Sequence, residues 1–180
     1  MPTRPAAALL VISMLAACGD AAPTPNVDRA ASIPAGAVKM TPAADPAPPI
    51  LHSDEWDEPV PLEDPVNTAG AEDSPFVLPD GSALYFWFTP DSSMPAEGQL
   101  GDGVTGIWVS HHDGTGWSEP ARVWLSDPGD DVLDGCPFVL DDTMWFCSVR
   151  AGNRRSIDIY TARLNDGVWI EWAGAGEPLN

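Results

Sequence analysis

Two stretches of the chain, SPFVLPDGSALYFWF at residues 74–88 and CPFVLDDTMWFC at residues 136–147, share one design. Each runs Pro-Phe-Val-Leu, then an acidic turn, then a hydrophobic residue, an aromatic residue and Phe. The Pro-Phe-Val-Leu segments lie 62 positions apart, and the triplets that begin at Leu84 and Met144 lie 60 apart. Short apolar runs bounded by turn residues favour β hairpins, so the repeat predicts two copies of one β unit.

Looser echoes extend the repeat. Residues 106–110 return at 157–161, DGTGWSEP at 113–120 returns as NDGVWIEW at 165–172, and DEWDEPV surrounds Trp56, 61 positions before Trp117. Helical periodicity is absent, so we expect an all-β fold. The expected strands of the first unit are residues 75–78, 84–88, 106–110 and 116–124, with the same order again from Cys136. Turns are expected at Pro79-Asp80-Gly81, Asp113-Gly114 and Asp166-Gly167, because Asp and Gly suit tight turns.

The motifs SPFVLPDGSALYF, GIWVSHHDGTGWSEPARV and DIYTARLNDGVW resemble PD40 repeats, the WD40-like propeller repeats of TolB-type bacterial envelope proteins. The resemblance covers about residues 56–180. The chain departs from the family pattern at Leu78, where the family has Ser, and at Asp141-Asp142, which replace the Pro-Asp-Gly turn. The resemblance implies four-stranded antiparallel β-propeller blades, and it implies no activity, since propellers host many functions.

The number of units is small for a propeller. Closed propellers contain about four to eight blades, whereas this chain holds about two, with a further strand expected at Trp56. Such an incomplete propeller has unpaired strand edges. A truncated gene product, completion by self-association and a small open β structure are three explanations. We expect truncation, because the sequence stops at GEPLN, where another unit would open.

The first residues have the layout of a lipoprotein signal peptide, expected over residues 1–17. Arg4 precedes an apolar run at residues 6–17, which is too short to span a bilayer. The run ends in LAAC, which resembles the bacterial lipobox. This resemblance implies cleavage between Ala17 and Cys18 and lipid on Cys18, which would hold the exported protein at a membrane. Gly19 favours the outer membrane, facing the periplasm or the cell surface, by resemblance to enterobacterial sorting; an ordinary secreted protein is the alternative.

The next segment is expected to be a tether. Residues 18–53 are dominated by Ala and Pro, which favour an extended, disordered spacer that contributes nothing to a core. The blades are then expected over residues 54–180. The chain carries a formal net charge of −19. Such a surface repels phosphate backbones, which excludes nucleic acid as an expected partner.

Two cysteines, Cys136 and Cys147, are candidates for a disulfide. With a two-residue turn at Asp141-Asp142 they would stand directly opposite each other across the hairpin, and an exported compartment permits disulfides. Two small buried thiols are the alternative. We expect neither a metal site nor a cofactor, because the nearest histidines, His111 and His112, belong to the preceding unit.

No other motif identifies a site. His111 and His112 are adjacent strand residues that point to opposite faces, and they are expected at the surface. The acidic stretches at residues 54–58, 72–73 and 127–134 are expected to be solvated loops, although calcium binds loop carboxylates. We therefore expect no catalytic residues and a non-enzymatic binding or scaffolding domain for an envelope protein or a glycan. The alternatives are a glycan-acting enzyme resembling propeller glycoside hydrolases, which would need a pair of carboxylates, and a fragment without independent function.

Overall fold

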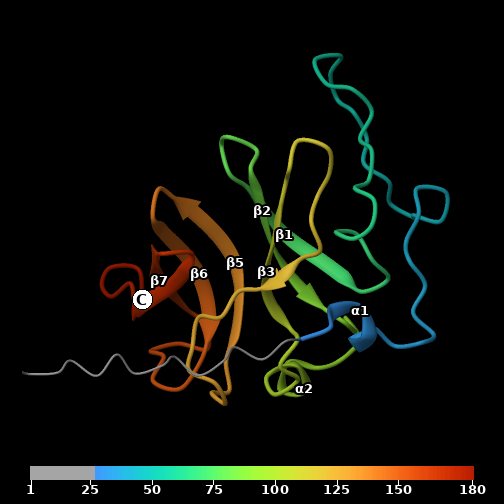
Figure 1. Cartoon of the computed structure of the whole chain (residues 1–180). Coiled ribbons are helices and arrows are strands. Elements are labelled where there is room, and N and C mark those ends of the chain that lie inside the picture. The colour runs from blue at the N-terminus through green and yellow to red at the C-terminus, as the bar shows by residue number, and fades with distance from the viewer. Residues whose placement is uncertain (1–26) are drawn as a thin grey trace, which may run out of the picture.

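The fold consists almost entirely of β strands, as Figure 1 shows for the computed structural model, which describes residues 27–180. Two four-stranded antiparallel sheets follow one another along the chain. The first sheet contains β1 (Ala71–Val77), β2 (Ala83–Thr89), β3 (Gly106–His111) and β4 (Ala121–Arg122). The second contains β5 (Leu133–Leu140), β6 (Thr143–Val149), β7 (Asp158–Asn165) and β8 (Val168–Gly174). The other elements of the described chain are α1 (Arg29–Ser32) and α2 (Ala96–Gln99). The expectation of an all-β fold built from four-stranded antiparallel units is confirmed.

Each sheet joins its strands in chain order, and tight turns connect β1 to β2, β5 to β6 and β7 to β8. Val77 pairs with Leu84 across the first turn of the first sheet, and Leu140 pairs with Thr143 across the matching turn of the second. Gly81 in the first turn has φ 74° and Asp141 in the second has φ 53°. Asp166 and Gly167, between β7 and β8, have φ 49° and 80°. Positive φ values at these residues let the hairpins close within few residues.

The two first strands, β1 and β5, carry the same β-bulge. The pairing register shifts between Asp73 and Phe76 in β1 and between Gly135 and Phe138 in β5. Ser74 and Cys136, which are 62 positions apart, have φ 50° and 52° within these bulges. A proline follows each of them, and proline fits a bulge because it has no N–H to donate to the ladder. The repeated sequence therefore has a repeated backbone geometry, which includes the β-bulge.

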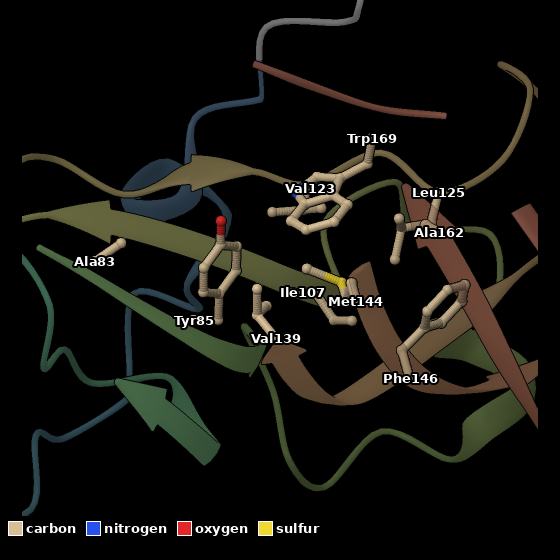
Figure 2. Close-up of a cluster of buried hydrophobic side chains, with 10 residues drawn as sticks. All are labelled: Ala83, Tyr85, Ile107, Val123, Leu125, Val139, Met144, Phe146, Ala162 and Trp169. Atoms are coloured by element: carbon tan, nitrogen blue, oxygen red, sulfur yellow. The ribbon is translucent and has the colours of Figure 1, made fainter. Parts of the chain in front are cut away.

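The main core lies between the two sheets. Strand β5 contacts β1, β2 and β3, and Figure 2 shows side chains from both sheets pointing toward one another. Tyr85 from β2 meets Trp169 from β8 edge to face, with ring centroids 6.2 Å apart. Each large apolar side chain buried here contributes about 1.5–3 kcal/mol. The buried members are Ala83, Tyr85, Ile107, Val123, Leu125, Val139, Met144, Phe146, Ala162 and Trp169.

The register assigns each side chain to one of two faces, because directly paired residues of an antiparallel ladder project to the same side. We call the face of the first sheet that carries the paired row Phe76, Tyr85 and Val109 its leading face. It packs on the trailing face of the second sheet, which carries the paired row Val139, Met144 and Ala162. The equivalent leading face of the second sheet carries Phe138, Trp145 and Thr161, and the equivalent trailing face of the first carries Val77, Leu84 and Ser110.

A second core cluster lies on the trailing face of the first sheet, where residues 27–33, here called the N-terminal strap, pack against it. The strap places α1 beside the first sheet (Figure 1), and Val27 and Ile33 pack against the cluster. The side chain of Arg29 is only 2% exposed. The expectation that residues 18–53 contribute nothing to a core is therefore wrong at these positions. The cluster contains Val66, Leu84, Phe86, Phe88, Val104 and Trp108.

Two expected strands differ in the structure. Trp56 belongs to no strand and is 75% exposed, because its acidic, proline-flanked neighbourhood has no partner strand. The strand expected at residues 116–124 is reduced to Ala121–Arg122. Trp117 instead forms an isolated bridge with His112, and Pro120, which has no N–H, separates this bridge from β4.

Candidate functional site

The leading face of the second sheet carries large apolar side chains that remain exposed. Phe138 is 47% exposed and Leu140 is 57% exposed on β5, and Trp145 on β6 is 36% exposed. Phe138 pairs with Trp145, and Trp145 pairs with Thr161, so these side chains form one row across three strands. Leu140 starts the adjacent row on the same face, which continues through Thr143, Arg163 and Ile170.

The same rows are covered in the first sheet. Phe76 and Tyr85 stand where Phe138 and Trp145 stand in the second sheet, and Tyr85 is only 6% exposed. Ile107, on the same face, is fully buried. Apolar residues that are exposed in one repeat and buried at the equivalent positions of the other indicate a surface that binds another protein. We therefore take the leading face of the second sheet as the candidate functional site.

A hollow of about 220 Å³ lies at the seam where the two first strands meet. Ser74 of β1 and Cys136 of β5 face each other there, with Oγ and Sγ 3.8 Å apart. Trp87 borders the hollow, and a Cβ on Gly135 would lie 3.2 Å from its Cδ1. The seam thus brings the two repeated bulges together and places both cysteines, Cys136 and Cys147, at one small cavity.

The bulge changes the expected geometry of the two cysteines. Cys147 pairs with Gly135 rather than with Cys136, because the register shifts between Gly135 and Phe138. The expectation that the cysteines stand directly opposite each other is therefore wrong. Both cysteines nevertheless line the same small cavity, and both are free in the structure. Burial, followed by the charge and hydrogen bond of Cys136, raises the pKa of the Cys147 thiol. The disulfide stays a prediction.

The residues expected to direct export and lipidation precede the part of the chain that the structure describes. Ala17 and Cys18, the expected cleavage and lipidation positions, lie outside the described residues. In the described part of the chain, no helix is long and apolar enough to cross a membrane.

The histidines lie at an exposed turn. His112 packs edge to face on Trp117, with centroids 5.0 Å apart, and its Nδ1 accepts a hydrogen bond from the N–H of Gly114 at 3.1 Å. His111 is exposed at the end of β3. These contacts hold the loop between His111 and Trp117, as expected for surface histidines.

The acidic stretches do not gather into one site. Asp127, Asp130 and Asp131 are exposed, whereas Asp134 is buried on β5. Within residues 27–180, no group of three or more His, Cys, Asp or Glu side chains is arranged to hold a metal ion.

Sequence reasoning missed a buried ion pair at the core of the second sheet. Arg150 donates to Asp134 at 2.7 Å and to the carbonyl of Leu125 at 3.2 Å, and its guanidinium lies 4.4 Å from the ring centroid of Tyr160. One signal was available: the 62-residue repeat that relates Phe76 to Phe138 also relates Glu72 to Asp134. An acid repeated inside a buried strand indicates a buried cation, because a lone buried carboxylate is costly.

Comparison with family models, with curated proteins and with solved structures found no match to the chain.

Proposed function

We propose that the protein is an exported lipoprotein, anchored through Cys18, whose two sheets are propeller-type blades that bind another protein through the leading face of the second sheet. The domain acts by binding and scaffolding rather than by catalysis. The single observation that supports protein binding is the exposure of Phe138, Leu140 and Trp145 at positions whose equivalents in the first sheet are packed. The lipobox and the repeat support the other parts of the proposal.

The chemistry of the face favours protein as the ligand. Leu140 and Phe138 are an aliphatic and an aromatic side chain on one face, and burying apolar surface contributes about 25 cal/mol per Å². The flanking Arg163 pairs with Asp142 at 2.8 Å on the exposed edge, which gives the patch a polar rim. An apolar centre with a polar rim is the usual composition of a protein interface.

Binding is tested with a photo-crosslinker placed at Thr143, on the same face next to Leu140, in the full chain expressed in its own envelope. The parent protein is expected to give discrete crosslinked partners. Leu140→Glu should remove them, because a carboxylate would be buried without a partner. Val60→Glu is the matched control, since Val60 is 83% exposed and lies outside both sheets. Equal crosslinking in both variants would contradict the proposal.

Anchoring is tested separately with Cys18→Ser. The parent is expected in the membrane fraction and to incorporate labelled fatty acid, and the variant is expected to lose both properties because it lacks the acceptor thiol. Cys147→Ser is the control for a general effect of removing a cysteine. A Cys18→Ser protein that remains lipid-labelled would refute the assignment of Cys18.

A further inference from the structure

Arg29 and Arg150 place their guanidinium groups at equivalent positions on the trailing faces of the two sheets. Arg29 lies 4.7 Å from the ring centroid of Phe88 and 5.4 Å from that of Phe86, and it pairs with Glu72 at 3.0 Å. Arg150 lies 5.5 Å from the centroid of Phe146 and pairs with Asp134 at 2.7 Å. Phe86 and Glu72 are the repeat equivalents of Phe146 and Asp134.

The backbone acceptors also correspond. Arg29 donates to the carbonyl of Val66 at 3.0 Å, in the segment that leads into β1, and Arg150 donates to the carbonyl of Leu125, in the segment that leads into β5. Arg150, however, follows β6 of its own sheet, whereas Arg29 reaches the first sheet from the strap. The first sheet therefore receives its buried guanidinium group from the strap, whereas the second sheet receives it from the residue that follows its own strand β6.

The imported arginine fits less completely than Arg150. The Nε–H of Arg150 donates to the hydroxyl of Ser148 at 2.7 Å. The repeat equivalent of Ser148 is Phe88, which offers no acceptor, and Nε of Arg29 is buried without a partner among residues 27–180. A buried donor left unpaired costs about 1–3 kcal/mol. The strap is thus a removable cover rather than an optimal part of the core.

The trailing face of the first sheet has the same kinds of side chains as the trailing face of the second, which binds a leading face. In the second sheet, Val139, Met144 and Phe146 receive Tyr85 and Ile107 of the preceding sheet. In the first sheet the equivalent residues are Val77, Leu84 and Phe86, which are again apolar and of similar size. Leu84 and Phe86 are buried, whereas Val77 at the edge of this face is 49% exposed. The chain therefore carries both halves of one interface, an open leading face on the second sheet and a strap-covered trailing face on the first.

We infer that the partner of the leading face is a second copy of this chain, which docks the trailing face of its first sheet when its strap is displaced. This inference rests on the proposed function, because it names the protein that the same face binds. The contact is head to tail and repeats the packing that already joins the two sheets. Head-to-tail contacts build rings or open arrays, and about two to four copies would supply the four to eight blades of a closed propeller.

Charge sets a condition on this assembly. Each chain carries a formal net charge of −19, so copies repel one another, and the interface itself is apolar. Added salt screens that repulsion over a Debye length of about 10 Å at 0.1 M. Association should therefore strengthen as salt rises, which is opposite to the behaviour of an interface held by ion pairs.

The test measures mass by sedimentation, using the full chain with Cys18→Ser to keep it free of lipid, over about a hundredfold range of concentration. The parent is expected as a single chain of 19.1 kDa, because the strap covers the receiving face. Arg29→Ala should release the strap and give concentration-dependent masses at multiples of one chain. Arg29→Ala with Leu140→Glu should return to a single chain, and Arg29→Ala with Val60→Glu should still associate.

Every outcome of this test decides the inference. The inference is overturned if Arg29→Ala protein is folded and stays a single chain. It is also overturned if the variant that combines Arg29→Ala with Leu140→Glu still associates, whether as folded protein or as an unfolded aggregate. Ile33→Glu, which removes an apolar strap contact and leaves Arg29 in place, should reproduce the association and is used to confirm it. If association fails while Leu140→Glu still removes envelope crosslinks, the face binds a different protein and the proposed function stands.

Discussion

Phe76 and Phe138 stand at the same position of the two units, 62 residues apart, and their rings meet edge to face with centroids 4.9 Å apart. The equivalent pair Ser74 and Cys136 meets at 3.8 Å. Equivalent atoms of two rotated units come this close only near the axis that relates the units. The first strands of the two sheets, β1 and β5, thus meet through equivalent residues, as the innermost strands of neighbouring propeller blades would, and this supports the proposal of propeller-type blades.

Removing Phe146 should show how much of the stability depends on the contact between the sheets. Phe146 is 1% exposed and belongs to the cluster that joins them. Phe146→Ala is expected to lower the free energy of unfolding by about 3–5 kcal/mol, because it leaves a cavity in a packed core. Urea unfolding of the full chain measures this change.

Phe138→Ala is the matched control for this substitution. Phe138 is the same residue type but is 47% exposed. Its loss should cost about 1 kcal/mol, mainly from the edge-to-face contact with Phe76. Equal losses for Phe138→Ala and Phe146→Ala would mean that the sheets do not pack through the cluster around Phe146.

Local sequence signals predicted the two four-stranded sheets but not the packing of the N-terminal residues on the first of them. The Pro-Phe-Val-Leu repeat and the Asp-Gly turns identified both hairpins and both sheets, because alternation and turn chemistry act between neighbours. The register at Cys136 was missed, since a bulge depends on a positive φ at one residue that no turn motif announces. Arg29 was missed because its partners, Glu72 and Val66, lie 43 and 37 positions away.

Gly106 should be intolerant of a side chain. Its φ is 145°, and a Cβ there would lie 2.1 Å from Nη2 of Arg122. Arg122 cannot easily move, because it donates to the carbonyls of Ile107 at 2.9 Å and Thr105 at 3.0 Å. Gly106→Ala is expected to lower the free energy of unfolding by about 1–3 kcal/mol, because the new Cβ is overpacked against Arg122 and the positive φ disfavours a side chain. Thermal or urea unfolding gives the value.

Gly116 provides the comparison for Gly106. A Cβ at Gly116 would meet nothing within 4 Å, and its φ is ordinary. Gly116→Ala should therefore change the free energy of unfolding by no more than about 0.5 kcal/mol. A loss at Gly116 as large as that at Gly106 would rule out the clash with Arg122 as the cause.

Asp113 should titrate at unusually low pH. The hydroxyl of Thr115 at 2.6 Å and the N–H groups of Thr115 and Gly116 donate to its carboxylate, and they lower its pKa from 3.8 to about 2. Its contribution to stability is present above the unfolded value of 3.8 and is lost as pH falls through about 2. A carboxyl NMR titration of the full chain should give this midpoint.

Variants at Thr115 separate the hydroxyl from the backbone donors. Thr115→Ala should raise the midpoint of Asp113 toward 3.8, because the hydroxyl is the largest cause of the shift. Thr115→Ser keeps a hydroxyl and should keep the low midpoint. An unchanged midpoint in Thr115→Ala would assign the shift to the N–H groups alone.

If the protein is exported as proposed, Cys136 and Cys147 should form a disulfide, although the bulge removes their direct opposition. Both cysteines line one small cavity, and a bridge across so short a loop is expected to contribute about 2–3 kcal/mol if it is unstrained. Protein taken from the envelope and denatured should therefore resist alkylation at both positions until it is reduced. Denaturation is essential, because a buried thiol with a raised pKa also reacts slowly in the folded state.

The reduced protein offers a second, independent readout of the same pair. The raised pKa of Cys147 means that the folded state disfavours its thiolate, so stability falls as pH rises from the ordinary value of 9.0 toward the folded one. Cys147→Ser should remove this alkaline loss. Rapid alkylation of both cysteines in denatured, unreduced envelope protein would show that they are thiols in the cell and would contradict the disulfide.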